Sequence, residues 1–160
     1  MNVADLLARA RAAGVMIAAA ESCTGGMVMA ALTSVPGSSD VVERGFVTYS
    51  NDAKIQMLGV VPETLRAHGA VSTEVAREMA AGALRNSKAQ LAVSITGIAG
   101  PGGSESKPEG RVCFGIARAG AQARVEMQDF GALGRSGVRR AACDHALALL
   151  MAALKDGSAI

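Results

Sequence analysis

The chain has 160 residues, a length that suits one domain with one well-buried core. Half of the residues are hydrophobic but only four are aromatic, so the core must consist mainly of Ala, Val, Leu, Ile and Met. The formal net charge of +2 indicates no particular partner, and the scarcity of aromatic side chains argues against a nucleic-acid surface built on base stacking. No apolar run approaches the ~18 residues of a membrane helix, so we expect no membrane partner.

Three cysteines and the N-terminus bear on compartment and cofactors. Cys23, Cys113 and Cys143 are odd in number and have no CxxC spacing, which argues against a disulfide framework and a structural zinc site. The first residues have neither the basic flank nor the apolar centre of a signal peptide. We therefore expect a cytoplasmic protein with no metal and no cofactor.

Apolar spacing and turn-forming residues predict the elements in chain order. They are a helix at 3–13, a strand at 15–20, a helix at 25–34, a strand-like stretch at 41–49 interrupted at 43–45, helices at 53–58, 62–67 and 72–85, strands at 91–95, 111–118 and 124–130, and a closing helix at 135–155. Buried strands flanked by helices favour an α/β fold, a three-layer α/β/α sandwich with a mixed, mostly parallel sheet of about five strands. No linker is evident, so residues 1–160 are expected to form one domain.

The segment AESCTGG, residues 20–26, follows the first strand and leads into a helix. One interpretation is that Ser22 and Thr24 only cap that helix, as Ser and Thr often do. The other makes Ser22 a nucleophile, which requires a nearby base to take its proton. Cys23 is a rival nucleophile, because a thiol at a helix N-terminus has a lowered pKa. The local sequence leaves these alternatives open.

The base for such a nucleophile is hard to find among the histidines. His68 stands at a predicted helix end, and His145 lies on or beside the apolar face of the last helix, where packing explains it. Lys54 is the candidate, because it follows a strand end together with Tyr49. A lysine can act as a base only if burial or positive surroundings lower its pKa towards neutrality. An exposed helix lysine and a tyrosine at the edge of the core are the plain alternatives.

A second glycine-rich stretch, Thr96 to Gly103, follows another buried strand. It matches neither a P-loop nor a GxGxxG turn that opens a helix. It could present backbone N–H groups to a phosphate or a carbonyl, or simply turn the chain. In an open α/β sheet, crevices beyond the carboxyl ends of the strands are the usual ligand sites, so the two glycine-rich segments could meet there.

Taken together, the motifs resemble one known family. AESCTGG, PGSS, ERGFVTYSNDAK followed by MLGV, GAVS, and TGIAGPGG with KPxG close behind occur here in order. The set closely resembles the CinA C-terminal domain family of competence/damage-inducible proteins, over about residues 5–153. Stand-alone members of that family are nicotinamide-nucleotide amidohydrolases.

The resemblance implies hydrolysis of the carboxamide of nicotinamide mononucleotide (NMN) to nicotinate mononucleotide and ammonia, in pyridine-nucleotide salvage. It also implies catalysis without a metal by a serine, a tyrosine and a lysine, here Ser22, Tyr49 and Lys54, and it disfavours Cys23. We expect backbone N–H groups around Thr24, Gly25 and Gly26 to hold the oxyanion. The ribose phosphate is assigned to the second loop and a nearby basic residue: Thr96, Gly97, Gly100, Gly102 and Arg44.

Three departures from the family pattern bear on binding. KPVG is here KPEG with Glu109, an Asp before the TGIAGP strand is here Gln90, and the last helix opens with Leu133-Gly134-Arg135 instead of Gly-Asp-Arg. None removes the proposed catalytic set.

Two other functions stay open from the sequence. One is a nucleotide-binding regulatory module without significant turnover, and the other is hydrolysis of a different amide or of a pyrophosphate bond. We also expect a homo-oligomer, with a dimer favoured and a higher cyclic state open.

Overall fold

A five-stranded sheet with the strand order β2-β1-β3-β4-β5 forms the centre of the protein. The structure, a computed structural model, describes residues 1–104 and 106–156. The strands are β1 (Ile17–Glu21), β2 (Val42–Val47), β3 (Leu91–Gly97), β4 (Arg111–Arg118) and β5 (Arg124–Asp129). β1 is parallel to β2 and β3, whereas β4 is antiparallel to β3 and β5. The predicted mixed sheet is confirmed, but "mostly parallel" fits loosely, because parallel and antiparallel neighbours are equally frequent.

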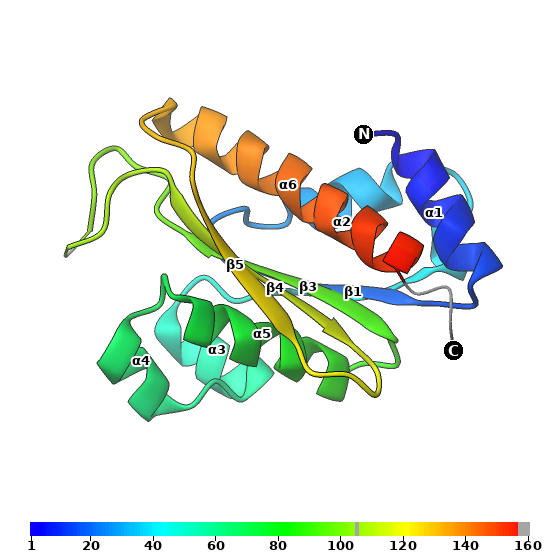
Figure 1. Cartoon of the computed structure of the whole chain (residues 1–160), viewed down its shortest axis with the longest axis horizontal. Helices are drawn as coiled ribbons and strands as arrows, with labels where there is room; N and C mark the ends of the chain where they lie inside the picture. Colours follow the sequence, from blue (N-terminus) through cyan, green and yellow to red (C-terminus); the bar gives the residue numbers. More distant parts are fainter. Residues whose placement is uncertain (105, 157–160) are drawn as a thin grey trace.

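Helices cover both faces of this sheet, which confirms the predicted three layers (Figure 1). One face carries α1 (Val3–Ala12), α2 (Met27–Thr33) and α6 (Gly134–Asp156). The other carries α3 (Asn51–Leu58), α4 (Pro62–His68) and α5 (Thr73–Arg85), and a short 3₁₀ turn, η1 (Ser38–Asp40), precedes β2. None of the helices in the described ranges combines the length and the apolar composition that crossing a membrane requires.

Two apolar clusters lie on either side of the sheet, and β1 contributes to both. Ile17 and Ala19 belong to the cluster under α1 and α6, whereas Ala18 and Ala20 belong to the cluster under α5. Alternation of side chains across a strand explains this division. Because both faces are covered, β1 is buried at every position, which is why it appears in the sequence as a continuous small apolar run.

Close backbone packing seats α5 between the sheet and α3. A Cβ atom at Gly115 of β4 would lie 2.5 Å from the carbonyl oxygen of Ala76 in α5. On the other side of α5, a Cβ atom at Gly82 would lie 2.0 Å from the carbonyl oxygen of Leu58 in α3. Two glycines therefore set how closely α3 approaches the sheet.

The interruption predicted at residues 43–45 is a register shift within the β1–β2 pair. Ile17 pairs with Val42, but the next residue, Ala18, pairs with Arg44, so one residue of β2 is skipped. β2 nevertheless ends beside β1 and β3 at the same edge of the sheet, since all three run in parallel. Residues that follow these three strands are thereby brought together.

Candidate active site

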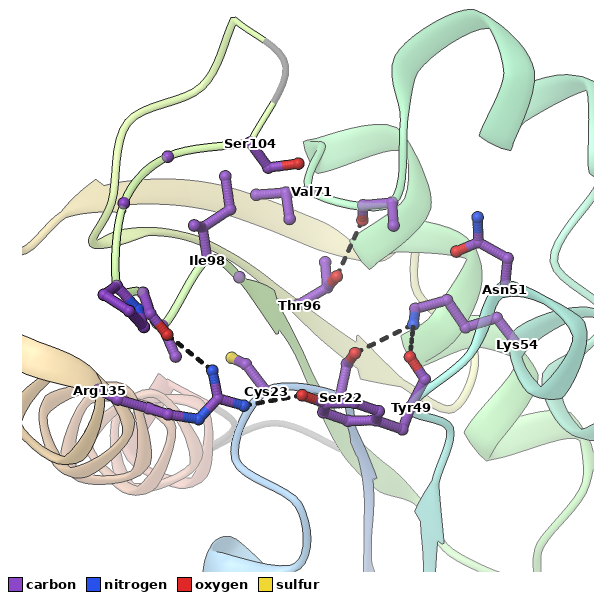
Figure 2. Close-up of a pocket in the computed structure, with 17 residues that line it drawn as sticks. Ser22, Cys23, Tyr49, Asn51, Lys54, Val71, Thr96, Ile98, Ser104 and Arg135 are labelled. Atoms are coloured by element: carbon purple, nitrogen blue, oxygen red, sulfur yellow. Dashed lines mark hydrogen bonds between the residues drawn. The ribbon is translucent and has the colours of Figure 1, made fainter.

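A pocket of about 360 Å³ lies at the carboxyl ends of β1, β2 and β3 (Figure 2). Both glycine-rich segments reach it, as the sequence predicted: the turn after β1 and the loop after β3. Its wall consists of Ser22, Cys23, Tyr49, Asn51, Lys54, Ala70, Val71, Thr96, Gly97, Ile98, Ala99, Gly100, Pro101, Gly102, Gly103, Ser104 and Arg135. Among the described residues, no group of three His, Cys, Asp or Glu side chains is placed to hold a metal ion.

Ser22 and Lys54 meet in this pocket although 32 positions separate them. The Lys54 Nζ donates a hydrogen bond to the Ser22 Oγ at 3.0 Å. Two backbone carbonyls, those of Thr48 at 2.8 Å and Tyr49 at 3.3 Å, also accept from the Lys54 Nζ. Helix α3 places the lysine there, and the Ser50 hydroxyl caps that helix by accepting from the N–H of Ala53.

The environment of Lys54 weakens its hold on a proton. The side chain is 1 % exposed, and in the described part of the chain no carboxylate pairs with it. Burial lowers the pKa of Lys54 from 10.5 to about 8, while the Cys23 thiolate would act in the opposite direction. A sizeable fraction of Lys54 is therefore neutral near pH 8, as the role of a general base requires.

Cys23, the rival nucleophile, is buried beside Ser22. Burial raises the pKa of the Cys23 thiol to about 11, although the positive charges of Lys54 and Arg139 act to lower it. A thiol of that pKa holds almost no thiolate at neutral pH. Its sulfur makes no hydrogen bond to a base in the described part of the chain, so the geometry favours Ser22.

Tyr49 lies in the pocket, but its hydroxyl does not join the Ser22–Lys54 contact. The Arg135 guanidinium donates to the Tyr49 hydroxyl at 2.8 Å and to the carbonyl of Gly100 at 2.7 Å (Figure 2). Only the backbone carbonyl of Tyr49 reaches Lys54. The ring is 63 % exposed and forms part of the pocket wall. The structure thus separates the phenol from the serine proton.

The interpretation of Ser22 and Thr24 as helix caps is wrong. The N-cap residue of α2 is Gly26, with a φ of 106° and no side-chain cap bond. The carboxylate of Glu21, which is fully buried, accepts instead from the N–H groups of Gly26, Val28 and Met29. Sequence reasoning missed this role because Glu21 precedes the helix by five residues, beyond the reach of the usual capping patterns.

The same bonds correct the predicted oxyanion hole. The N–H of Gly26 is taken by Glu21 and the N–H of Gly25 by the carbonyl of Ser22. Neither glycine lines the pocket, nor does Thr24, which is fully buried. These three residues instead support the serine from behind, with Gly25 and Gly26 adopting the left-handed backbone that the tight turn requires.

The predicted residues of the second loop are where the sequence placed them. Thr96, Gly97, Gly100 and Gly102 all line the pocket. The Thr96 hydroxyl donates to the carbonyl of Ala70, which ties β3 to the connection between α4 and α5. Lys107 reinforces this link by donating to the carbonyl of Val71 at 2.6 Å. The loop is therefore held against the opposite wall of the pocket.

Arg44 was expected to bind substrate, but it does not reach the pocket. Its guanidinium donates to the carbonyl of Asn86 at the C-terminal end of α5 and pairs with Glu43. The reason is its position on β2, three residues before the carboxyl end of that strand. That Arg44 is close to Tyr49 in sequence does not indicate whether its side chain reaches the pocket.

Two pocket residues with polar or charged side chains at the starts of helices, Arg135 and Asn51, were absent from the sequence-based set. Arg135 enters from the first turn of α6, and Asn51 enters from the first turn of α3. Ser50, not Asn51, caps α3, so the Asn51 side chain can face the pocket. A cation directly after Gly134, at the position of the Gly-Asp-Arg pattern, was the signal that could have identified Arg135.

Two departures from the family pattern have visible places. The Glu109 carboxylate lies against Gly100, where a Cβ atom would be 1.9 Å from its Oε1, and it does not line the pocket. The Gln90 side chain accepts from the N–H of Met16 at 2.8 Å, at the opposite end of β1 and β3 from Ser22. Gln90 therefore belongs to the framework of the sheet.

Comparison with known proteins agrees with this arrangement. The model of the family described as "CinA C-terminal domain" matches residues 2–154. The chain belongs to this family. A crystal structure of the competence/damage inducible protein CihA from Agrobacterium tumefaciens superposes with a TM-score of 0.88 at 46% identity, covering 96% of this chain and 95% of that one.

Curated relatives in the family are of two lengths. The chain is 52% identical to the nicotinamide-nucleotide amidohydrolase PncC of Escherichia coli K12, over 88% of this chain and 85% of that protein. It is 59% identical to a CinA-like protein of Chloroherpeton thalassium over 72% of this chain, but the match spans only 27% of that longer relative. The relationship thus covers most of PncC and about a quarter of the longer protein.

Proposed function

We propose that the protein hydrolyses the carboxamide of NMN to nicotinate mononucleotide and ammonia, as the name of its relative PncC states for that protein. The observation that carries the proposal is the 3.0 Å contact between the Lys54 Nζ and the Ser22 Oγ inside the pocket. A serine paired with a buried lysine is a nucleophile with its own base. This chemistry suits cleavage of an amide, and hydrolysis of NMN would serve pyridine-nucleotide salvage.

In the proposed mechanism, Ser22 attacks the carboxamide carbon. Lys54 in its neutral form takes the serine proton along the existing contact and later gives it to the departing ammonia. Water then attacks the acyl-enzyme while Lys54 takes one of its protons, and Lys54 returns that proton to the Ser22 Oγ as nicotinate mononucleotide leaves. Both proton transfers use one group, so the pKa of about 8 for Lys54 suits its alternation between base and acid near neutral pH.

We assign the phosphate of NMN to Arg135 and the loop after β3. Arg135 is the cation of the pocket wall other than Lys54, and a guanidinium fits a phosphate in a bidentate manner. Within the described residues, the backbone N–H groups of Gly102 and Gly103 have no acceptor, so they are available to an anion. The Arg135 guanidinium donates to the hydroxyl of the exposed Tyr49 ring, so a phosphate bound at Arg135 would bring the nicotinamide ribose to that ring. Tyr49 then orients the substrate.

Ammonia release from NMN by the purified protein tests the proposal. Ser22→Ala should bind NMN, measured by calorimetry, but release no ammonia. Full activity of that variant would exclude the serine mechanism. A panel of nicotinamide, glutamine, NAD and ADP-ribose checks the substrate. Binding of NMN by the unaltered protein without release of ammonia would favour the regulatory nucleotide-binding module instead.

A further inference from the structure

Arg139 lies directly behind the nucleophile and has no role in the mechanism above. It comes from α6, one turn beyond Arg135, and is partly buried. Its Nε donates to the carbonyl of Cys23 at 3.0 Å, and its Nη2 donates to the carbonyl of Thr24 at 3.3 Å. Gly25 lies beside this guanidinium, where a Cβ atom would be 3.4 Å from the Arg139 Nη2, an ordinary contact distance. The guanidinium therefore binds two successive peptide groups of the turn that carries Ser22.

The carbonyls that Arg139 binds belong to the same turn as two backbone N–H groups that lack an acceptor among the described residues. The N–H of Ser22 is taken by Ile95, that of Gly25 by Ser22, and that of Gly26 by Glu21. Within the described residues, neither the N–H of Thr24 nor that of Cys23 donates to another residue. The residue after a nucleophile commonly supplies an oxyanion-hole donor, and here that residue is Cys23.

Both of these N–H groups belong to peptides that a donor polarises from the other side. The Arg139 Nε binds the carbonyl of the Cys23–Thr24 peptide, whose N–H is that of Thr24. The Arg139 Nη2 binds the carbonyl of the Thr24–Gly25 peptide, and the Gly25 N–H of that peptide in turn donates to the carbonyl of Ser22. That last carbonyl shares its peptide with the N–H of Cys23. Hydrogen bonds linked in this way strengthen one another.

We infer that Arg139 is a positioning residue that fixes the Ser22 turn and, through the linked peptide groups, polarises the N–H of Cys23, which lines the pocket, as an oxyanion-hole donor for Ser22. The inference rests on the proposed amide hydrolysis and deepens it. A positive charge held behind the peptides favours the negative oxygen of the tetrahedral intermediate, and it does so without touching the substrate. In this arrangement Arg135 contacts the substrate directly, whereas Arg139 acts through the backbone of the Ser22 turn.

The first test compares Arg139→Met with Arg140→Met, which removes the same charge from the exposed neighbouring residue. Loss of an oxyanion-hole donor lowers kcat about 10²- to 10³-fold, and loss of polarisation should lower it less, roughly 10- to 100-fold. We expect that fall in kcat for Arg139→Met with KM changed less than about twofold. Arg140→Met should match the unaltered enzyme. Arg139→Lys should recover part of the rate, because an ammonium can donate to the same carbonyls.

The second test uses the thioamide analogue of NMN, in which sulfur replaces the carboxamide oxygen. Sulfur accepts hydrogen bonds poorly, so an oxyanion hole favours the oxygen substrate. The ratio of kcat for the amide to kcat for the thioamide should therefore fall about tenfold or more in Arg139→Met. A merely structural role would slow both substrates equally and leave the ratio unchanged.

The outcomes separate the two proposals. Equal losses on amide and thioamide, or unchanged kcat in Arg139→Met, would overturn the role of Arg139 while leaving the amidase intact. Absence of ammonia release by the unaltered protein would overturn both. If Arg139→Met does not fold, Arg139→Gln keeps a neutral donor near the turn and is judged by the same ratio.

Discussion

At the level of a single residue, Lys54 shows how burial weakens the hold of an amine on its proton. In the folded protein its amine donates to one hydroxyl and two carbonyls instead of to water, and none of these groups carries a charge. The ammonium is therefore less stable in the folded protein than in water, and its pKa falls. Activity and stability should both report this one titration.

Activity should rise with pH as Lys54 loses its proton. We expect kcat/KM for NMN to increase up to about pH 8 and then to level off, because only the neutral amine can accept the Ser22 proton. A pH–rate profile measured by ammonia release checks this. A rising limb near 10.5, the ordinary value of the lysine, would contradict the role of burial.

Removing the lysine should abolish activity but raise the free energy of unfolding at neutral pH. In the folded protein Lys54 binds its proton below about pH 8, whereas in the unfolded chain it does so below 10.5. Between these values the unfolded state holds more protons, so the free energy of unfolding rises with pH. At neutral pH the difference disfavours folding by roughly 3 kcal/mol, since each unit of pKa corresponds to 1.36 kcal/mol.

Lys54→Met should therefore be inactive yet more stable at pH 7, by up to about 3 kcal/mol. Its gain should shrink as the pH approaches 10. Urea unfolding at several pH values measures both effects. Lys88→Met, at an exposed position, is the matched control and should alter neither stability nor its pH dependence. A loss of stability in Lys54→Met at every pH would show that the amine contributes packing or bonds that outweigh its desolvation.

Arg135 is a second single residue with a testable role: its guanidinium is expected to favour phosphorylated over unphosphorylated substrates. Arg135→Met should raise KM for NMN roughly 10- to 100-fold, as loss of a charged hydrogen bond of about 1.5–3 kcal/mol implies. KM for nicotinamide riboside, which lacks the phosphate, should stay within about threefold. Steady-state kinetics with both substrates provides the measurement. An equal rise for both substrates would move the phosphate elsewhere.

Helix α3 is the element that delivers Lys54, so its N-terminal cap should matter for catalysis. Ser50→Ala removes the hydroxyl that accepts from Ala53 and should cost about 1 kcal/mol of stability. Because Lys54 lies in the first turn of α3, we also expect kcat to fall severalfold. Asn2→Ala removes the corresponding cap of α1, a helix that contributes nothing to the pocket. That control should lose similar stability and keep full kcat.

How far the sequence predicted these elements depends on whether the deciding contacts are local. Turn residues and apolar spacing located the helices and strands to within a few residues, because caps such as Ser72 and stops such as Gly59 are local signals. The start of α2 was placed two residues early, because the left-handed Gly25 and Gly26 delay it. No spacing rule signals that a strand residue, Glu21, would bind the amides of the helix that follows.

The site was predicted in the same uneven way. Motif order singled out Ser22, Tyr49 and Lys54, and the structure brings all three to one pocket. The prediction that Arg44 lines the pocket was wrong, because strand pairing directs its side chain to the carbonyl of Asn86. The position of Arg139 could not be predicted, since no local pattern connects it to carbonyls more than a hundred positions earlier. The roles assigned to these residues stay predictions until the variants are measured.

At the scale of the whole molecule, the approach of α3 to the sheet depends on the glycine contacts of α5. Gly82→Ala places a methyl group against the backbone of Leu58 and should push α3, with Lys54, away from Ser22. We expect a loss of about 1–3 kcal/mol from overpacking, even though alanine favours helices, together with a fall in kcat.

Gly45→Ala is the matched comparison for this substitution. The three atoms nearest to the new methyl group there all belong to the flexible side chain of Met29, which can move aside. Thermal unfolding and ammonia release should therefore change little in Gly45→Ala. Normal activity in Gly82→Ala would show that α3 can shift without carrying the lysine away.

The contacts of α6 with the Ser22 turn have a consequence for protein synthesis. Ser22, Lys54 and both glycine-rich segments emerge from the ribosome within the first 104 residues. Arg135 and Arg139, which bind Gly100, Cys23 and Thr24, are translated later. A nascent chain halted before α6 would hold Ser22 and Lys54 without either guanidinium. The appearance of amidase activity should thus mark the moment at which the last helix docks, and stalled chains of increasing length would time that event.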